Sequence, residues 1–203
     1  NFTPTNDSVY EGDETATIAI SSVSGGSATE SGSQSATITI RDNEIAGSVT
    51  LTVSATSIAE NAGTSLTITA TLSSTSDEDV TVALSTSGTA TEGTDYTDGS
   101  GVIDDITISA GSTTGTVNFT PTDDSVYEGN ETATIAISSV SGGDASESGD
   151  QSVTVTITEN ESAPTVTLSV SATSIAENAG TSITVTATLS GATDEAVTVA
   201  LST

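Results

Sequence analysis

The stretch Ser65-Leu66-Thr67-Ile68-Thr69-Ala70-Thr71-Leu72 decides the fold class, because apolar and hydroxyl residues alternate along it with a period of two. Such alternation is typical of a β-strand that buries one face. The same pattern recurs at residues 80–82, 134–137 and 153–157. The polar positions are mostly Thr, whose branched Cβ favours extended backbone. Although a strong net charge with few aromatic residues is typical of disorder, this periodicity predicts an ordered, all-β chain.

The charge composition excludes several classes of function. The 203 residues include 28 Asp or Glu and a single basic residue, Arg41, with no His or Cys, so the net charge is −27. Ser-His-Asp and Cys-His nucleophiles and zinc-finger sites are therefore excluded. Nucleic acids and anionic membranes are bound through Lys and Arg, and no run of 18 apolar residues is present to cross a bilayer. We expect no nucleic-acid partner and no direct membrane insertion.

An enzymatic function is also not expected. Paired carboxylates hydrolyse glycosidic bonds in many enzymes, but such sites usually include aromatic platforms for the sugar. The repeat between residues 45 and 161 contains only two Tyr and one Phe. The many Ser and Thr hydroxyls have no general base other than a carboxylate to activate them.

The chain is a tandem repeat with an offset of 117 residues. Residues 1–86 align with 118–203 without a gap, and 67 of these 86 positions are identical. We place one complete domain at 48–161, the C-terminal part of a preceding repeat at 1–44 and the N-terminal part of the next repeat at 166–203. Seven short strands are expected in the complete domain, at 49–54, 64–72, 79–85, 102–109, 113–119, 131–138 and 151–158. This number suits an immunoglobulin-like antiparallel β-sandwich.

The carboxylates gather in a few segments. The run Asp123-Asp124-Ser125-Val126-Tyr127-Glu128-Gly129-Asn130-Glu131 holds four of them in nine residues, and Glu159-Asn160-Glu161 adds two. Glu60 and Asp95 lie in loops that a sandwich brings to the same end. Without Lys or Arg nearby, crowded carboxylates repel one another, and a hard cation such as Ca²⁺, which takes six to eight oxygen ligands, removes that repulsion. The alternative is that these residues are solvated turn formers.

Three segments resemble a known family. They are Ile58-Ala59-Glu60-Asn61, then Gly88-Thr89-Ala90-Thr91-Glu92-Gly93-Thr94-Asp95-Tyr96, then the acidic run from Asp123 to Glu131. Their order and content, followed by Thr156-Ile157 and a short acidic tail, resemble Calx-beta repeats. The resemblance implies a seven-stranded sandwich whose loops at one end hold calcium ions.

The resemblance also implies a set of metal ligands. In the complete domain they are Glu60, Asp95, Asp123, Asp124, the Val126 carbonyl, Glu128, Glu131, Glu159, Asn160 and Glu161. The preceding repeat offers Asp7, Glu11, Glu14, Asp42, Asn43 and Glu44, with Asn6 in place of the first Asp, and the following repeat offers Glu177. The acidic tail is shorter than the run of Asp common in the family. The same resemblance makes Tyr96 structural, whereas Tyr10 and Tyr127 are expected mainly to pack, with a hydrogen bond of the tyrosine-corner type as the alternative.

The leading functional hypothesis is a Ca²⁺-binding spacer or stalk of a large extracellular protein on a bacterial surface, such as an adhesin or a filament involved in cell adhesion or biofilm. Near-identical repeats suit a spacer, whose partners are neighbouring repeats of the same protein. A second hypothesis, motivated by the start of the chain within a repeat, is a homopolymer assembled by intermolecular β-strand complementation. A third is a calcium-sensing regulatory domain. A carbohydrate-binding module is less well supported because aromatic residues are few.

Overall fold

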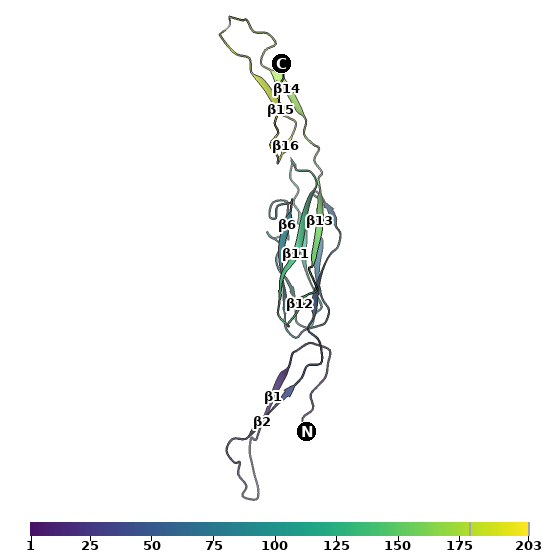
Figure 1. Cartoon of the computed structure of the whole chain (residues 1–203), viewed down its shortest axis with the longest axis vertical. Coiled ribbons are helices and arrows are strands. Elements are labelled where there is room, and N and C mark those ends of the chain that lie inside the picture. Colours follow the sequence, from purple (N-terminus) through teal and green to yellow (C-terminus); the bar gives the residue numbers. More distant parts are fainter. Residues whose placement is uncertain (179, 203) are drawn as a thin grey trace.

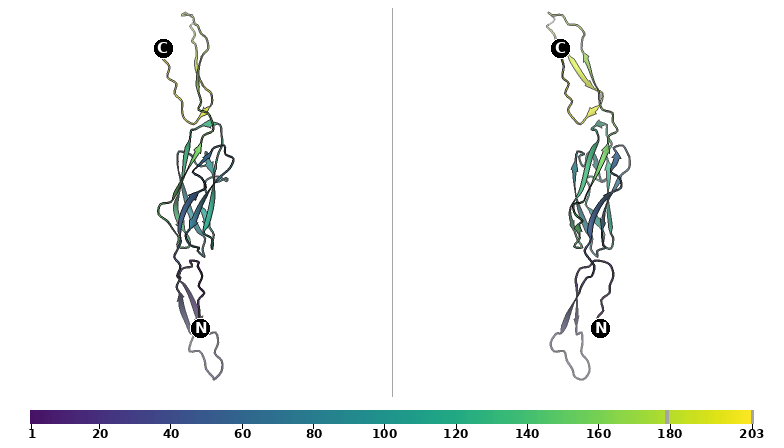
Figure 2. Two further views of the ribbon diagram at one scale, coloured as in Figure 1. Left: turned by 90° about the vertical axis from the view of Figure 1, so that its right-hand side faces the viewer. Right: turned by 45° about the vertical axis from the view of Figure 1, so that its right-hand side comes forward.

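The computed structural model describes residues 1–178 and 180–202 of the chain. A β-sandwich occupies the middle, and one β-hairpin lies on each side of it along the same long axis (Figures 1 and 2). No α-helix occurs in the described residues, which confirms the all-β prediction. Consequently, the described part of the chain also contains no helix long and apolar enough to cross a membrane. The expected third repeat, 166–203, includes two positions, 179 and 203, that lie outside the described residues.

Two five-stranded sheets form the sandwich. The first has the order β4 (Ser57–Ala59), β13 (Ser152–Thr158), β11 (Glu131–Ser141), β6 (Val80–Gly88) and β8 (Ile106–Ile108). The second has the order β12 (Ser146–Glu147), β3 (Ser48–Val53), β5 (Leu66–Leu72), β9 (Thr114–Pro121) and β7 (Tyr96–Thr97). Neighbouring strands are antiparallel except at the edges, where β4 runs parallel to β13 and β12 runs parallel to β3.

The core lies between the inner faces of the two sheets. Alternate residues of β5, namely Ile68, Ala70 and Leu72, are buried, whereas the Thr residues between them are half-buried on the other face. This is the burial that the period of two predicts. Tyr96 and Phe119 stack on each other in the core with ring centroids 4.7 Å apart. The structural role expected for Tyr96 therefore agrees with its position.

Each of the seven expected strands has a counterpart, and the two largest differences in length have identifiable causes. The segment 102–109 narrows to Ile106–Ile108, because Glu92 Oε1 accepts a hydrogen bond from Ile103 N and holds that residue outside the ladder. In contrast, β11 extends to Ser141 through a bulge between Ile137 and Ser139. The short strands β4, β7 and β12 were not expected, because two or three residues are too few to show a period.

A close approach between two strands explains the glycine that opens the Gly88–Tyr96 segment. Gly88 has a φ of 134°, and a Cβ at this position would lie 2.0 Å from the Thr132 carbonyl oxygen. Only glycine combines that dihedral with that contact. It allows β6 to end against β11 and the chain to turn into the loop that carries Asp95.

The flanking repeats keep their local pairing. In the first, β1 (Glu14–Ala19) pairs with β2 (Ser35–Ile40), and in the last, β14 (Val166–Val170) pairs with β15 (Val185–Leu189). Both registers equal those of the complete sandwich shifted by 117 residues, since β1–β2 corresponds to β11–β13 and β14–β15 to β3–β5. A further short parallel pair joins β10 (Val126–Tyr127) to β16 (Ala192–Thr193). Strand pairing is thus encoded locally, within each hairpin.

Candidate metal centre

A pair of parallel strands brings the first group of carboxylates together. In the register of β4 with β13, Ala59 lies opposite Thr158, and Glu60 N donates to the Thr158 carbonyl over 3.0 Å. Parallel strands end at the same edge of a sheet, so the residues that follow them are neighbours. Glu60, Glu159 and Glu161 meet there, with one carboxylate oxygen of each within 4.8 Å of the others. We call these three residues the first carboxylate cluster.

The first cluster is partly removed from solvent and incompletely satisfied. Glu60 is only 5% exposed, and its Oε1 accepts one hydrogen bond from Asp124 N. Glu161 Oε1 accepts from Asn160 Nδ2, but Glu161 Oε2 is buried without a hydrogen-bond partner. A buried carboxylate oxygen without a partner is unfavourable. A proton shared with a neighbouring carboxylate or a bound cation would remove that cost.

The acidic run from Asp123 to Glu131 forms a turn that leads into β11, and this acidic turn holds Glu159 in place. Glu159 Oε2 accepts hydrogen bonds from Glu128 N and Gly129 N, at 2.6 and 2.8 Å. In return, Glu159 N donates to Asn130 Oδ1 over 3.0 Å. Gly129 adopts a φ of 79°, the left-handed conformation that turns both N–H groups toward the same carboxylate.

The second carboxylate cluster consists of Asp95, Glu128 and Glu131, whose carboxylate oxygens also lie within 4.8 Å of one another. The loop before β7 carries Asp95, and it is fixed to β11 by Ala90 N, which donates to the Thr132 carbonyl. At its other end Thr122 N donates to the Asp95 carbonyl. The two clusters adjoin, because Glu128 belongs to the second and its N–H binds Glu159 of the first.

The remaining predicted ligands of the complete domain lie beside these clusters. Asp124 contacts the first cluster through its backbone N–H, and its Oδ1 accepts from Val126 N over 2.7 Å. Asp123 is exposed, and its charge adds to the rise in the pKa of Glu161 that the side-chain interaction with Glu159 mainly causes. Val126 lies in β10, whose backbone pairs with β16. Metal ligation by these residues and by Asn160 stays a prediction.

Burial and mutual repulsion shift the pKa values in both clusters. Burial raises the pKa of Glu60 to about 7; the hydrogen bond from Asp124 N–H opposes this rise, and the charges of Glu159 and Glu161 add to it. Burial, together with Asp95, raises the pKa of Glu131 to about 7. Each cluster thus contains one carboxyl group that retains a proton to near neutral pH when no cation is bound.

Glu159 behaves in the opposite way. Burial raises its pKa, but the N–H groups of Glu161, Glu128 and Gly129 outweigh that effect and hold the pKa at about 2. Glu159 is therefore the permanently charged member of the first cluster. The side-chain interaction with Glu159 in turn raises the pKa of Glu161.

The preceding repeat reproduces part of this arrangement. Asp42, which occupies the place of Glu159, accepts hydrogen bonds from Glu11 N and Gly12 N at 2.8 and 2.7 Å, and Asp42 N donates to Asp13 Oδ1. The predicted ligands of this repeat surround one small cavity of about 30 Å³; they are Asp7, Glu11, Glu14, Asp42, Asn43 and Glu44, together with Asn6. The positions equivalent to Glu60 and Asp95 fall before residue 1. In the last repeat Glu177 is exposed in a turn.

Two structural residues of the site did not stand out in the sequence. Asn130 orients the acidic tail Glu159-Asn160-Glu161, because its Oδ1 accepts a hydrogen bond from Glu159 N. Glu92 is not a member of either cluster, because its carboxylate accepts from Thr86 Oγ1 and Ile103 N and fixes the loop before β7. Both residues lie inside the segments that resemble the family, which is the only sign of them in the sequence. Their hydrogen bonds show that they support the site and do not belong to a carboxylate cluster.

The residues present fit a calcium ion. Every donor is an oxygen, and the unpartnered Glu161 Oε2 shows that the first cluster lacks a positive partner. Two oxygens bound to one Ca²⁺ are at most about 5 Å apart, because Ca–O distances are 2.3–2.6 Å. The 4.8 Å limit of both clusters satisfies this condition. When bound, Ca²⁺ would be held by the carboxylates of a cluster and would neutralise the repulsion among them.

Comparison with known proteins gives one family and one similar fold. A sequence model described as the Calx-beta domain matches residues 1–44 and 42–161. No curated protein sequence matches the chain. A solved structure described as the apo form of the Calx CBD1 domain is 19% identical, covers 57% of this chain and 98% of its own, and superposes with a TM-score of 0.45.

Proposed function

The chain belongs to the Calx-beta domain family, and from this premise we propose that it is a Ca²⁺-stiffened spacer within a tandem array of an extracellular surface protein. Calx-beta domains bind Ca²⁺, and the two carboxylate clusters supply suitable oxygens. The proposed role is structural and non-catalytic. It includes an adhesin or filament at a bacterial surface as the parent protein, with neighbouring repeats as the partners.

The observation that carries the proposal is the position of the clusters at a boundary between repeats. Glu159 and Glu161 are the last residues of the complete domain, and β10, inside the acidic turn, pairs with β16 of the following repeat. The charge of Asp194, from that following repeat, contributes to raising the pKa values of Glu128 and Glu131. A cation bound at the second cluster would therefore reduce repulsion across the boundary as well as within the domain.

The near-identity of the repeats supports a spacer over a sensor. A spacer requires only that successive units have the same length and stiffness, and the array satisfies this with 67 of 86 aligned residues identical. A sensor would bind at micromolar Ca²⁺ and change shape on binding. An affinity in the millimolar range, which is usual for extracellular calcium modules, would favour the spacer.

Calorimetry, thermal unfolding and small-angle X-ray scattering test the proposal together. At Ca²⁺ concentrations about 100-fold above Kd, binding stabilises the folded state by about 2.7 kcal/mol, which raises the melting temperature of a domain of this size by roughly 10 °C. Mg²⁺ should give a smaller shift, because it requires a tighter octahedral site. The scattering should also show a longer and less variable particle in Ca²⁺ than in chelator.

A matched pair of variants makes the test specific. The double variant Glu60→Gln/Glu161→Gln removes two charges from the first cluster and should abolish most of the calcium-induced shift. Asp150→Asn is the control, because Asp150 is exposed and the preceding repeat has Ser33 in its place. Equal melting temperatures and dimensions in Ca²⁺ and chelator for the natural sequence would exclude the calcium-dependent spacer.

A further inference from the structure

The same backbone contact occurs at both boundaries between repeats. At the first, Tyr10 forms a parallel bridge with Ser76, in which Tyr10 N donates to the Thr75 carbonyl over 2.9 Å and Asp77 N donates to the Tyr10 carbonyl over 3.1 Å. At the second, β10 pairs in parallel with β16, and Asp194 N donates to the Tyr127 carbonyl over 3.4 Å. Subtracting 117 from Tyr127, Thr193 and Asp194 gives Tyr10, Ser76 and Asp77. One contact is therefore present twice.

The contact is carried by the backbone, since the side chains around it change. The receiving segment is Ser74-Thr75-Ser76 at the first boundary and Gly191-Ala192-Thr193 at the second. The linkers differ as well, with Ile45-Ala46-Gly47 replaced by Ser162-Ala163-Pro164. N–H and carbonyl groups are common to both versions, and they give the same pairing in spite of these differences. This is the chemistry of strand addition to a sheet edge.

The receiving segment is anchored in its own sandwich. Ser76 is only 3% exposed, its carbonyl accepts from Gly111 N over 2.7 Å, and its Oγ accepts from Glu78 N. Glu78 Oε2 in turn accepts from Gly143 N. The segment is therefore fixed by several elements of the domain, so a neighbour that pairs with it is held in one orientation.

A side-chain contact reinforces the first boundary. The Tyr10 hydroxyl donates to Asp144 Oδ2 over 2.8 Å, across a separation of 134 residues in the sequence. Asp144 lies in a tight loop with a φ of 47°, and Ser27, its equivalent one repeat earlier, has a φ of 55°. Packing was the leading expectation for Tyr10 from the sequence and a hydrogen bond the alternative; the structure shows a hydrogen bond, and it goes to the next repeat.

We propose that residues 8–10 of one repeat and 74–77 of the next form a docking joint that fixes the relative orientation of successive repeats. The partner is the following repeat of the same chain. Each repeat presents the Tyr segment at its boundary with the following repeat and the receiving segment at its boundary with the preceding one. The contact is therefore head-to-tail and can continue along the array without closing. The biological meaning rests on the proposed spacer role, but the joint itself needs no bound ion.

Spin labels test the joint directly, because the chain has no Cys and labels attach only where Cys is introduced. Thr15→Cys in β1 and Thr107→Cys in β8 are both exposed strand positions on opposite sides of the first boundary. Double electron–electron resonance in chelator should give a narrow distance distribution. Adding Tyr10→Pro, which removes the N–H bonded to Thr75, should broaden it at least twofold.

Two further variants keep the test decisive. Tyr127→Pro is the matched control, since it alters the second boundary and should leave this distribution unchanged. Tyr10→Phe removes only the hydroxyl bonded to Asp144 and should broaden the distribution less than Tyr10→Pro. Tyr10 lies outside the sandwich, so an unchanged melting temperature of the sandwich establishes that the domain itself remains folded.

The outcomes separate the joint from the calcium-dependent function. An equal width for Tyr10→Pro and the natural sequence would overturn the joint. A distribution that is broad in chelator and narrow only in Ca²⁺ would also overturn it while supporting calcium stiffening. A distribution that is narrow in both conditions and broadened by Tyr10→Pro would support the joint even if calcium stiffening fails.

Discussion

The complete sandwich and the flanking repeats contain nearly the same sequence in different surroundings. Ile135 of β11 is fully buried, whereas Ile18, its equivalent in β1, is 49% exposed. Leu51 of β3 is 6% exposed and its equivalent Leu168 is 58% exposed. The hairpins nonetheless keep their register. Strand pairing is thus determined within a hairpin, but burial requires the second sheet.

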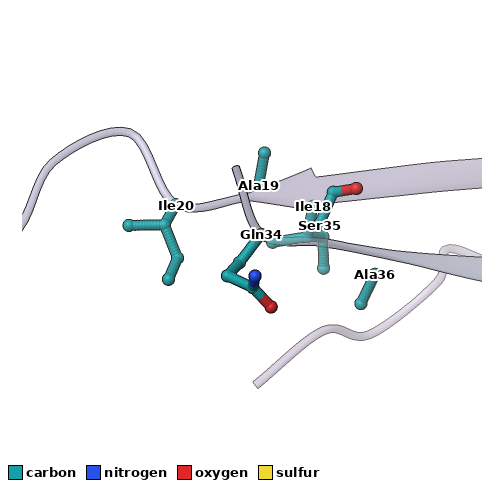
Figure 3. Close-up of a pocket in the computed structure, with 6 residues that line it drawn as sticks. All are labelled: Ile18, Ala19, Ile20, Gln34, Ser35 and Ala36. Carbon is teal, nitrogen blue, oxygen red and sulfur yellow. The ribbon is translucent and has the colours of Figure 1, made fainter. Parts of the chain in front are cut away.

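The close-up of the β1–β2 hairpin shows how the side chains of its two faces lie. Ala19 points away from the side on which Gln34 and Ala36 lie, as expected for alternating faces of a strand pair (Figure 3). Ile18 and Ile20 line an open depression there, while their equivalents Ile135 and Ile137 are in the core. The apolar face is already formed in the hairpin, and the opposite sheet covers it in the complete domain.

The candidate metal centre also consists of a part formed within one hairpin and a part that needs the whole sandwich. In both repeats, N–H groups of the acidic turn donate hydrogen bonds to the first carboxylate after the last strand. That carboxylate is Asp42 in the first repeat and Glu159 in the complete domain. Glu60 and Asp95 come from elements outside the β11–β13 hairpin. One part of the site is therefore preformed by local structure, and the other part is supplied only when a whole sandwich assembles.

The largest expected difference between the two regions is the effect of a core deletion. Ile135→Ala should lower the free energy of unfolding by about 2–5 kcal/mol, because it leaves a cavity in a packed core. Ile18→Ala removes the same atoms from an exposed face and should change it by less than about 0.5 kcal/mol. Urea unfolding of both variants measures the difference. Similar losses would mean that the first hairpin is buried in solution.

A second difference concerns pH in the absence of metal. The folded-state pKa values of Glu60 and Glu131, about 7, lie above the ordinary value of 4.5, so the folded domain binds more protons between these limits. Its stability should therefore fall as the pH rises from about 4.5 to 7 in chelator. Glu159, with a pKa of about 2, stays charged throughout this window. Thermal unfolding at a series of pH values checks the trend.

Two comparisons sharpen the pH experiment. Glu60→Gln should flatten the dependence, since it removes one of the two groups whose pKa is about 7. Saturating Ca²⁺ should also oppose it, because the cation competes with protons for the same oxygens and binds better as the pH rises. Stability that increases with pH across this range in chelator would contradict the assigned environments of Glu60 and Glu131.

The smallest effect is expected at the first position of the acidic turn. The preceding repeat has Asn6 where the complete domain has Asp123, and Asp123 is exposed. Asp123→Asn should therefore change the stability of the calcium-free domain by less than about 0.5 kcal/mol. Calorimetric titration then decides whether Asp123 is a ligand: a loss of one bound ion would assign it to the site, and an unchanged affinity would place it outside.

The sequence was sufficient for those features that depend on local pattern. The period of two at 65–72 predicted β5, and the offset of 117 predicted the matching hairpins. The resemblance of the Gly88–Tyr96 and Asp123–Glu131 segments indicated the family, which the match over residues 1–161 confirms. These signals are contained in short, contiguous stretches.

Other features depend on contacts between distant residues and left no trace in the pattern. The edge strand β4 has three residues, and only its pairing with β13, about 100 positions away, places Glu60 beside Glu159. The bond from Tyr10 to Asp144 spans 134 positions. The family resemblance singled out Asp95, which joins a cluster, but gave no role to Glu92, whose hydrogen bonds fix the loop.

The placement of the three tyrosines gives this chain a set of built-in optical probes. There is no Trp, so tyrosine dominates the near-ultraviolet signal. Tyr96 is stacked in the sandwich core, Tyr10 lies in the first joint and Tyr127 in the second. The hydrogen bond to Asp144 raises the pKa of Tyr10, and burial raises that of Tyr96. Alkaline titration and fluorescence of single Tyr→Phe variants would thus separate the opening of a joint from the melting of a domain, without any added dye.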